Sequence, residues 1–384
     1  MRIVFIFLLA FSLQVSAQQI KTGAEQTDRY LPLLKAKKIG LVVNHTSMVG
    51  EQHLLDFLLS KGVNVIRIFC PEHGFRGNAD AGEEISDQRD SKTGLPIVSL
   101  YGDNKKPTVE QIADLDLLIF DVQDVGVRFY TYISTMHYVM EACAENGKQL
   151  LIFDRPNPNG DYLGGPVLKP EFKSFVGMHP IPVVHGCTIG ELAQMINGEG
   201  WLKNQVKCNL TIIPVANYNH NMRYSLPVKP SPNLPNDQAI RLYPSLCFFE
   251  ATSASIGRGT YFPFQVVGYP DQRFGDFQFT PKSIEGMSKN PKQLEKVCYG
   301  IDLRDKTCSP KFTLSYFLEF YHQFEDESVF LTRERWFNLL AGTDQLLKDI
   351  RAGKNLEEIE AGWNDELDSY RVIRKKYLLY PDFN

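Results

Sequence analysis

The sequence lacks the short motifs that mark the commonest nucleotide sites and serine nucleophiles. No G-x-x-x-x-G-K-[ST] segment occurs, no G-x-G-x-x-G segment follows the first predicted strand, and G-x-S-x-G is absent. A phosphate-cradling loop, a dinucleotide cofactor and a nucleophile elbow are therefore not expected. We predict that the protein works without a cofactor.

Cysteine is sparse and shows no pattern. The 384 residues include seven cysteines, an odd number with irregular spacing, and no C-x-x-C or Cys/His metal motif. Most lie in apolar runs, such as Cys247 in LCFFE, where a reduced cysteine behaves as a small core residue. We expect neither a disulfide-dense scaffold nor a metal site.

Neither sign of charge dominates, and basic residues are not clustered. The formal net charge is −4, and the 41 Lys and Arg residues are scattered along the chain. Because nucleic-acid binding needs a basic face, no nucleic-acid partner is expected. No stretch of about twenty uninterrupted apolar residues follows the N-terminal segment, so we expect no stable membrane anchor. The sequence leaves the oligomeric state open.

The N-terminal segment MRIVFIFLLAFSLQVSAQQ has the layout of a secretory signal peptide. Arg2 precedes a short apolar run, which ends at the small residues of Val15-Ser16-Ala17. The run is too short to span a bilayer stably. We expect residues 1–17 to be removed by cleavage near Ala17 and the protein to be exported, periplasmic or secreted. The alternative is an N-terminal core strand.

The chain is long enough for two domains, because a single core stops growing at roughly 250–300 residues. In its first part, apolar runs alternate with amphipathic segments. Strands are predicted in 37–47, 63–74, 95–102, 117–120 and 149–160, and helices in 51–62, after Thr108 and in 131–148. This order favours a mostly parallel sheet with helices on both faces. We place this domain at residues 18–165.

Residues 166–384 are predicted to form a second α/β domain with C-terminal helices. A helix after Thr188 has Glu191 three residues further on, which is capping-box spacing, and 208–218 is a strand candidate. The last hundred residues contain at least two helices, in 332–353 and 355–380. We expect this helical tail to pack on the second domain or on the first.

Polar side chains collect where the predicted strands end. Four clusters occur, at residues 44–47, 72–73, 121–132 and 154–157. Ligands of open parallel sheets bind beyond the carboxyl ends of the strands. We therefore expect the functional site at this edge of the sheet.

Glu72 and His73 lie in FCPEHGFRG, directly after Pro71 interrupts a strand. A carboxyl group next to an imidazole and under Phe69 and Phe75 has the surroundings of a general acid with a raised pKa. The structural alternative is a turn in which Glu72 caps the next helix and His73 satisfies a backbone group.

The segment DVQDVGVRFYTY, residues 121–132, is denser in polar groups. Arg128 suits bidentate binding of a carboxylate, and Tyr130 and Tyr132 offer stacking faces and hydroxyls to a sugar. Asp124 precedes them. An aromatic stripe of helix core would explain Phe129 and one tyrosine, but not the arginine with two aspartates.

Two further segments carry candidate groups. VVHGCTIGEL contains His185 and Glu191, for which a satisfied structural histidine and a capping-box residue are the alternatives. FFEATSASIGRGT contains Glu250 and Arg258, and a glycine-flanked arginine suits anion binding.

Taken in order, eight motifs resemble those of the exo-β-N-acetylmuramidases, long known as the DUF1343 family: LVVNHTS, PEHGFRG, FDVQDVGVRFYTY, DRPNPNG, IPVVHGCTIGELA, PSPNLP, GRGT and KKYLLY. The resemblance covers the chain from about residue 20 to its end. It implies a Rossmann-like domain, a second α/β domain and a site between them. It also implies a glycoside hydrolase that releases terminal β-1,4-linked N-acetylmuramic acid from the non-reducing end of peptidoglycan fragments, so that a muropeptide or disaccharide is the partner.

The resemblance also implies roles for individual residues. Glu72 maps to the acid/base, and His73 and Glu250 accompany it as catalytic groups. The sugar site would be lined by Asn44, Asp124, Arg128, Tyr130, Tyr132, His185, Glu191 and Arg258. An arginine, Arg128 or Arg258, would select the lactyl carboxylate of the substrate.

The identity of the second catalytic group stays open at this point. Most glycosidases need two carboxyl groups, and Glu250, Glu191, Asp124 or the substrate acetamide could complete the pair. Many relatives read S-E-G-R-G-T where this chain has Ile256. That difference favours the alternative of a catalytically inactive cell-wall sugar-binding protein. An esterase or amidase acting through Ser47 or Ser134 is a third reading.

Overall fold

A computed structural model describes residues 19–71, 75, 88–304 and 311–383 of the chain. Its first domain is built on a seven-stranded sheet in the order β11-β8-β7-β1-β4-β6-β5. The strands are β1 (Ile39–Val43), β4 (Val65–Cys70), β5 (Gln88–Arg89), β6 (Pro96–Ser99), β7 (Leu117–Asp121), β8 (Gln149–Phe153) and β11 (Asn209–Ile213). Six are parallel, and β5 pairs antiparallel at the edge. The six parallel strands follow the Rossmann order, so the predicted fold class is confirmed.

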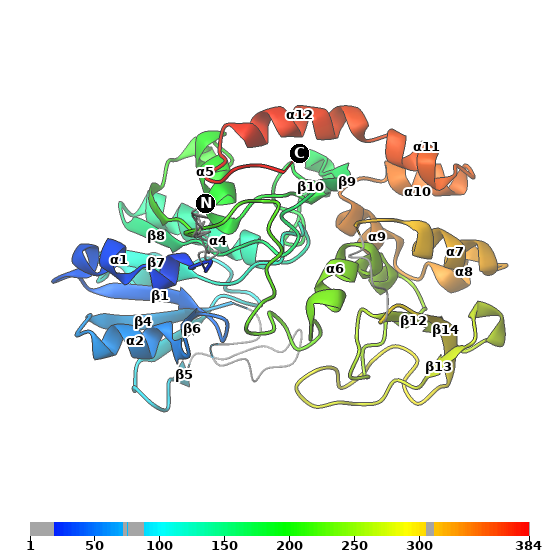
Figure 1. Cartoon of the computed structure of the whole chain (residues 1–384), viewed down its shortest axis with the longest axis horizontal. Helices are drawn as coiled ribbons and strands as arrows, with labels where there is room; N and C mark the ends of the chain where they lie inside the picture. Colours follow the sequence, from blue (N-terminus) through cyan, green and yellow to red (C-terminus); the bar gives the residue numbers. More distant parts are fainter. Residues whose placement is uncertain (1–18, 72–74, 76–87, 305–310, 384) are drawn as a thin grey trace, which may run out of the picture.

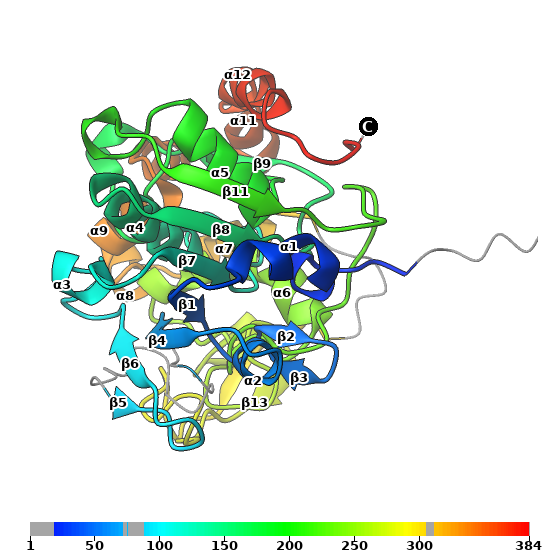
Figure 2. The same cartoon turned by 90° about the vertical axis from the view of Figure 1, so that its left-hand side faces the viewer.

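Both faces of the sheet are buried, which explains why its strands read as continuous apolar runs. Leu117 and Ile119 of β7 belong to one core with helices α1 (Thr27–Leu34) and α2 (Leu54–Ser60). Leu118 and Phe120 belong to a second core, with α4 (Tyr132–Glu145) and α5 (Ile189–Gly198). Figure 2 shows the sheet between these helices.

The first domain extends beyond the predicted boundary at 165/166. Strand β11, predicted to belong to the second domain, pairs in parallel with β8 from Asn209 to Ile213 and completes the first sheet. The boundary was therefore placed too early, because a single strand in the sequence does not reveal the sheet it joins.

The second domain combines a small antiparallel sheet with helices (Figure 1). The sheet has the order β12-β14-β13, with β12 (Val266–Tyr269), β13 (Phe277–Phe279) and β14 (Cys298–Asp302). The helices are α6 (Asp237–Leu246), α7 (Ser315–Gln323), α8 (Glu327–Phe330), α9 (Glu334–Ala341), α10 (Gln345–Arg351) and α11 (Leu356–Ala361). The smaller elements of the first domain are β2 (Met48–Val49), β3 (Gln52–His53), β9 (Gly164–Val167), β10 (Pro182–Val184) and α3 (Val109–Ile112).

Local signals in the sequence set the helix boundaries. Thr108 and Thr188 each cap a helix through a capping box, as predicted for Thr188. Gly342 ends α9 in the left-handed conformation with φ 73°, so the segment predicted as one helix becomes α9 and α10.

The C-terminal tail returns to the first domain, which is one of the two predicted arrangements. Helix α12 (Asn364–Lys375) lies along the top of the molecule in Figure 1. The Tyr370 hydroxyl donates to the His185 carbonyl at 2.8 Å, and Arg374 donates to the Gly186 carbonyl. The Tyr380 hydroxyl accepts from the Val215 amide at 2.8 Å and donates to Asp154.

Across the residues that the structure describes, we find no helix with the length and apolar character that a bilayer crossing requires.

We predict that Tyr380→Phe lowers the free energy of unfolding by about 1–3 kcal/mol, because the buried Val215 amide and the Asp154 carboxyl would each lose a hydrogen-bond partner. Urea unfolding measures the change. Tyr261→Phe removes the same hydroxyl at a side chain that is 81% exposed and should leave stability unchanged. Equal losses in the two variants would contradict the prediction.

Candidate active site

The polar loops after β1, β7 and β8 meet, as the strand-end clusters predicted. The Ser47 hydroxyl donates to the Asp121 carbonyl, and the Thr46 hydroxyl accepts from the Gln123 amide at 3.0 Å. Arg155 forms a two-pronged ion pair with the Asp121 carboxylate, at 2.6 and 2.9 Å. All five side chains are buried, so these groups hold the loops together.

Asn44, predicted to bind substrate, belongs to this buried set. Its side-chain oxygen accepts from the amide and the hydroxyl of Thr46, at 2.9 and 2.6 Å, and the residue is fully buried. The structure therefore gives Asn44 a role in closing a turn and places it outside the described lining of the cavity, and its substrate contact stays a prediction.

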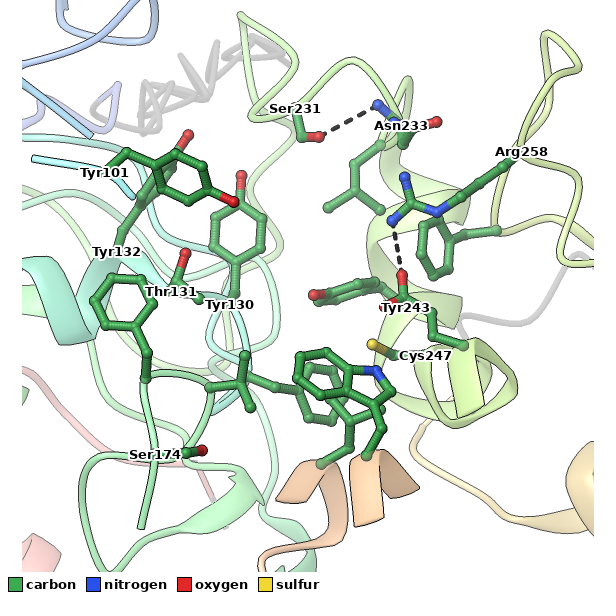
Figure 3. A pocket seen from close by; sticks show the side chains of 18 of the residues that line it. Tyr101, Tyr130, Thr131, Tyr132, Ser174, Ser231, Asn233, Tyr243, Cys247 and Arg258 are labelled. Carbon is green, nitrogen blue, oxygen red and sulfur yellow. Dashed lines mark hydrogen bonds and ion pairs between the residues drawn. The ribbon is translucent and has the colours of Figure 1, made fainter. Parts of the chain in front are cut away.

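A cavity of about 530 Å³ lies where the two domains face each other (Figure 3). The loops after β6 and β7 and residues 174–176 line it from the first domain. Residues 231–264 and α9 supply the rest of its lining. Its volume is that of a small-molecule site, roughly 300–1,000 Å³.

Aromatic side chains dominate the lining. They are Tyr101, Phe129, Tyr130, Tyr132, Phe175, Tyr243, Phe264 and Trp336. Polar groups lie among them, including Thr131, Ser174, Ser231 and Asn233. Amphipathic rings combined with a few fixed polar groups suit a ligand that has both apolar faces and hydroxyls.

Tyr130 and Tyr132 line the cavity, where the sequence predicted a sugar contact. Their rings pack edge to face with centroids 4.8 Å apart. The Tyr130 hydroxyl donates to the Pro230 carbonyl at 2.8 Å, which links the β7–α4 loop to the segment before α6. Burial raises the pKa of Tyr130 well above its usual value, so its hydroxyl keeps its proton.

Glu250 and Arg258 also line the cavity, and they form an ion pair with 2.7 Å between Oε1 and Nη2. Both side chains are half-buried, and the Arg258 guanidinium lies 5.1 Å from the centre of the Phe264 ring. The Phe264 ring therefore helps to hold the arginine of the pair in place. Figure 3 shows Arg258 across the cavity from Tyr130 and Tyr132.

The backbone that carries Glu250 is braced by Lys292. The Lys292 ammonium donates to the carbonyls of Phe249 at 2.8 Å and Glu250 at 2.9 Å, and to that of Thr252. Burial lowers the pKa of Lys292 to about 8. These bonds satisfy carbonyls at the end of a short helix, Cys247–Ala251, that has no continuing turn.

Arg128 does not line the cavity, and its prediction as a substrate-binding fork is corrected. Its guanidinium is fully buried and donates to the carbonyls of Pro166, Ile181, Leu340 and Ala341 at 2.6–2.9 Å. Both terminal nitrogens of the guanidinium are thus engaged by backbone carbonyls.

Asp124 and His185 face each other, with 3.8 Å between Oδ2 and Nε2. Neither is part of the lining. Burial raises the pKa of Asp124 to about 7 and lowers the pKa of His185 to about 3. Burial therefore favours the neutral form of both groups. The structure brings the two predicted residues together, outside the described lining of the cavity.

Glu191, also predicted to bind substrate, is a structural residue. Its carboxylate accepts from the Thr188 amide at 2.9 Å in the capping box, and it contacts His220 at 3.0 Å and the Leu379 amide at 2.9 Å. It is fully buried, so the alternative of a capping-box role is the correct one.

Glu72 and His73 lie outside the described residues, and their catalytic role stays a prediction. The strand that precedes them, β4, ends next to a segment that lines the cavity. The Leu100 amide donates to the Cys70 carbonyl at 2.8 Å, so the end of β4 is bonded to the segment that continues into Tyr101 of the cavity.

Two observations bear on the alternative readings. The Ser47 hydroxyl donates to the Asp121 carbonyl and the Ser134 hydroxyl to the Phe175 carbonyl, so neither is held by a base as an esterase nucleophile would be. Ile256 packs in the apolar core and contributes nothing to the cavity lining.

Several lining residues were missed from the sequence. Lys105 follows the third predicted strand, and the rule of polar groups at strand ends would have found it. Tyr243, Phe264 and Trp336 carried no signal, because they reach the cavity from a domain that has no parallel sheet to organise its loops. Within the described residues, no three His, Cys, Asp or Glu side chains gather as metal ligands would.

These features define a class of protein first: an α/β enzyme with a Rossmann-like domain and an aromatic-lined cavity suited to a carbohydrate. The chain belongs to the exo-β-N-acetylmuramidase NamZ family. The N-terminal family profile matches residues 39–238 and the C-terminal profile matches residues 241–380.

Individual relatives agree with this assignment. The chain is 38% identical to the peptidoglycan β-N-acetylmuramidase NamZ of Bacillus subtilis strain 168, over 94% of this chain and 92% of that protein. A crystal structure of a DUF1343 family protein from Bacteroides fragilis superimposes with a TM-score of 0.88, at 48% identity over 95% of this chain and all of that one. A second protein of that family and organism gives 0.82, at 29% identity over 94% and 99%.

We predict that Asp124→Asn stabilises the fold in a pH-dependent way. The folded pKa of about 7 exceeds the unfolded value of about 3.9, so the wild type loses stability as pH rises between these values and loses no more above pH 7. Asparagine has no charge to bury, and its side-chain oxygen can still accept the hydrogen bond from the Gly126 amide. The variant should gain up to about 4 kcal/mol at pH 8 and little at pH 4.5. Urea unfolding at both pH values tests this, and a pH-independent difference would contradict it.

Proposed function

We propose that this protein is an exo-acting glycoside hydrolase that releases terminal β-1,4-linked N-acetylmuramic acid from the non-reducing end of peptidoglycan fragments. The observation that carries the proposal is the match of both family domains along the chain, together with an aromatic-lined cavity between the domains. A cavity of this size accommodates one sugar residue, as an exo-acting enzyme requires.

The sugar binds with Tyr130 and Tyr132 on one side and the Glu250–Arg258 pair on the other. The tyrosines supply flat, apolar surface for the ring. The ion pair supplies donors and acceptors for hydroxyl or acetamide groups at little net charge. Its anchoring by Phe264 and Lys292 reduces the entropy lost when substrate binds.

Glu72 is the proposed general acid, with His73 beside it. Of the candidates for a second group, Asp124 and Glu191 are buried away from the cavity, whereas Glu250 lies in its lining. Glu250 or the substrate acetamide therefore stabilises the charge that develops at the anomeric carbon. In either case the proton reaches the leaving oxygen from Glu72.

We expect Glu72→Gln to lower kcat for a synthetic β-N-acetylmuramic acid glycoside by about 10²–10⁴-fold, because glutamine keeps the shape and cannot donate the proton. Release of the chromogenic leaving group measures the rate, and the pH–rate profile of the variant should lose the fall in rate at high pH, which in the wild type reports deprotonation of the general acid. The N-acetylglucosamine analogue shows whether the turnover is specific for the muramic sugar.

Glu51→Gln is the matched control, since Glu51 is an exposed glutamate outside the cavity lining. It should retain the wild-type rate. If the wild type binds the sugar and does not cleave it, the hydrolase proposal is wrong, and the alternative of a cell-wall sugar-binding protein is supported. Release of acetate or lactate would indicate an esterase.

We also propose that the protein is exported after cleavage near Ala17, on the strength of the N-terminal segment Met1–Gln19. N-terminal sequencing of the protein from the exported fraction of an expressing cell should begin close to residue 18. Recovery of the intact Met1 terminus from the cytoplasm alone would refute this proposal.

A further inference from the structure

The lining of the cavity contains one cation that the proposed function has not used. Lys105 lies in the loop after β6, on the first-domain side with Tyr101, and its ammonium is 5.4 Å from the centre of the Phe175 ring. Its neighbour Lys106 is engaged elsewhere, since it pairs with Glu141 at 3.1 Å and with Glu145 at 2.7 Å. The two lysines therefore serve different purposes.

The charges of the lining do not cancel. Its charged members, among the described residues, are Lys105, Glu250 and Arg258. Glu250 and Arg258 neutralise each other at 2.7 Å. No carboxylate of the described chain lies within ion-pair distance of Lys105, so the described part of the lining carries one uncompensated positive charge. Placing a positive charge beside apolar surface is costly, and an arriving anion reduces that cost.

The Phe175 ring holds Lys105 at the cavity. A ring face attracts an ammonium group without neutralising it, which leaves its protons free to bind an acceptor. Tyr138 stacks on Phe175 from α4, with ring centroids 6.3 Å apart, and the Ser134 hydroxyl donates to the Phe175 carbonyl at 2.7 Å. This support fixes where the ammonium lies.

We propose that Lys105 is the residue that recognises the lactyl carboxylate of the substrate, and so determines the preference for N-acetylmuramic acid over N-acetylglucosamine. This inference rests on the proposed function. It assigns the carboxylate to Lys105 and not to either arginine. Arg128 is engaged by four carbonyls, and Arg258 is already balanced by Glu250.

The test compares two substrates that differ only in charge: a β-N-acetylmuramic acid glycoside, and the same glycoside with its lactyl carboxylate converted to the carboxamide. In the wild type, kcat/KM should favour the carboxylate about ten- to hundredfold, as one charge-assisted hydrogen bond does. In Lys105→Met the ratio should fall to about one. Lys105→Arg, which keeps the charge, should restore part of the preference.

Lys61→Met is the matched control. The Lys61 ammonium also lies 5.4 Å from a phenylalanine ring, that of Phe57, at the end of α2 and outside the cavity lining. The variant has the same change in net charge and should keep the wild-type ratio. Raising the salt concentration should weaken the preference of the wild type and leave Lys105→Met unchanged.

Calorimetric binding of free N-acetylmuramic acid and its carboxamide provides a readout that does not need turnover. If the wild type cleaves neither substrate, the proposed function fails, while a binding preference that Lys105→Met removes still supports the role of Lys105. A preference that survives in Lys105→Met, in rate and in binding, overturns the inference and leaves the hydrolase intact. A wild type that binds both sugars equally overturns it as well.

Discussion

The cavity depends on the hydrogen bonds that the buried guanidinium of Arg128 donates to four backbone carbonyls. The guanidinium has no exposed surface, and it donates to two carbonyls of the first domain, those of Pro166 and Ile181, and to two at the end of α9, those of Leu340 and Ala341. One side chain thus joins the loop after β7 to a helix more than 200 residues away. A buried charge is costly unless it is hydrogen-bonded, and four carbonyls meet this need at the two terminal nitrogens, so the geometry around them is strongly constrained.

That constraint reaches the cavity from both sides. Residues 129–132 follow Arg128 directly, and Leu340 is itself part of the lining together with Trp336 of α9. Gly342 completes the arrangement, because a Cβ atom there would lie 2.6 Å from the guanidinium. The ion pair of Glu250 and Arg258, with its brace from Lys292, plays the corresponding part within the second domain. The cavity is therefore held by polar contacts to backbone on both sides.

The sequence predicted the regular parts of the molecule well. Alternating apolar and amphipathic segments identified the parallel sheet, since both faces of each strand are covered. The family resemblance was also correct. The predicted domain boundary was wrong because the sequence of β11 does not show that this strand pairs with β8. Among the site residues, Tyr130, Tyr132, Glu250 and Arg258 lie at the cavity, whereas Asn44, Arg128 and Glu191 hold the fold. A sequence motif does not distinguish a residue needed for the fold from one needed for activity, which is why Arg128 was predicted to bind substrate.

By itself, the sequence determined which elements form, where their caps lie, and to which family the chain belongs, because these depend on local periodicity, capping residues and ordered motifs. Tertiary structure decided which polar groups face the cavity. Whether Arg128 or Lys105 is available to an anion depends on contacts between residues far apart in the chain, and on which carbonyls and carboxylates have already been taken up. The sequence gives the number of charged residues, whereas the packing of the folded chain determines which of them lack a partner of opposite charge.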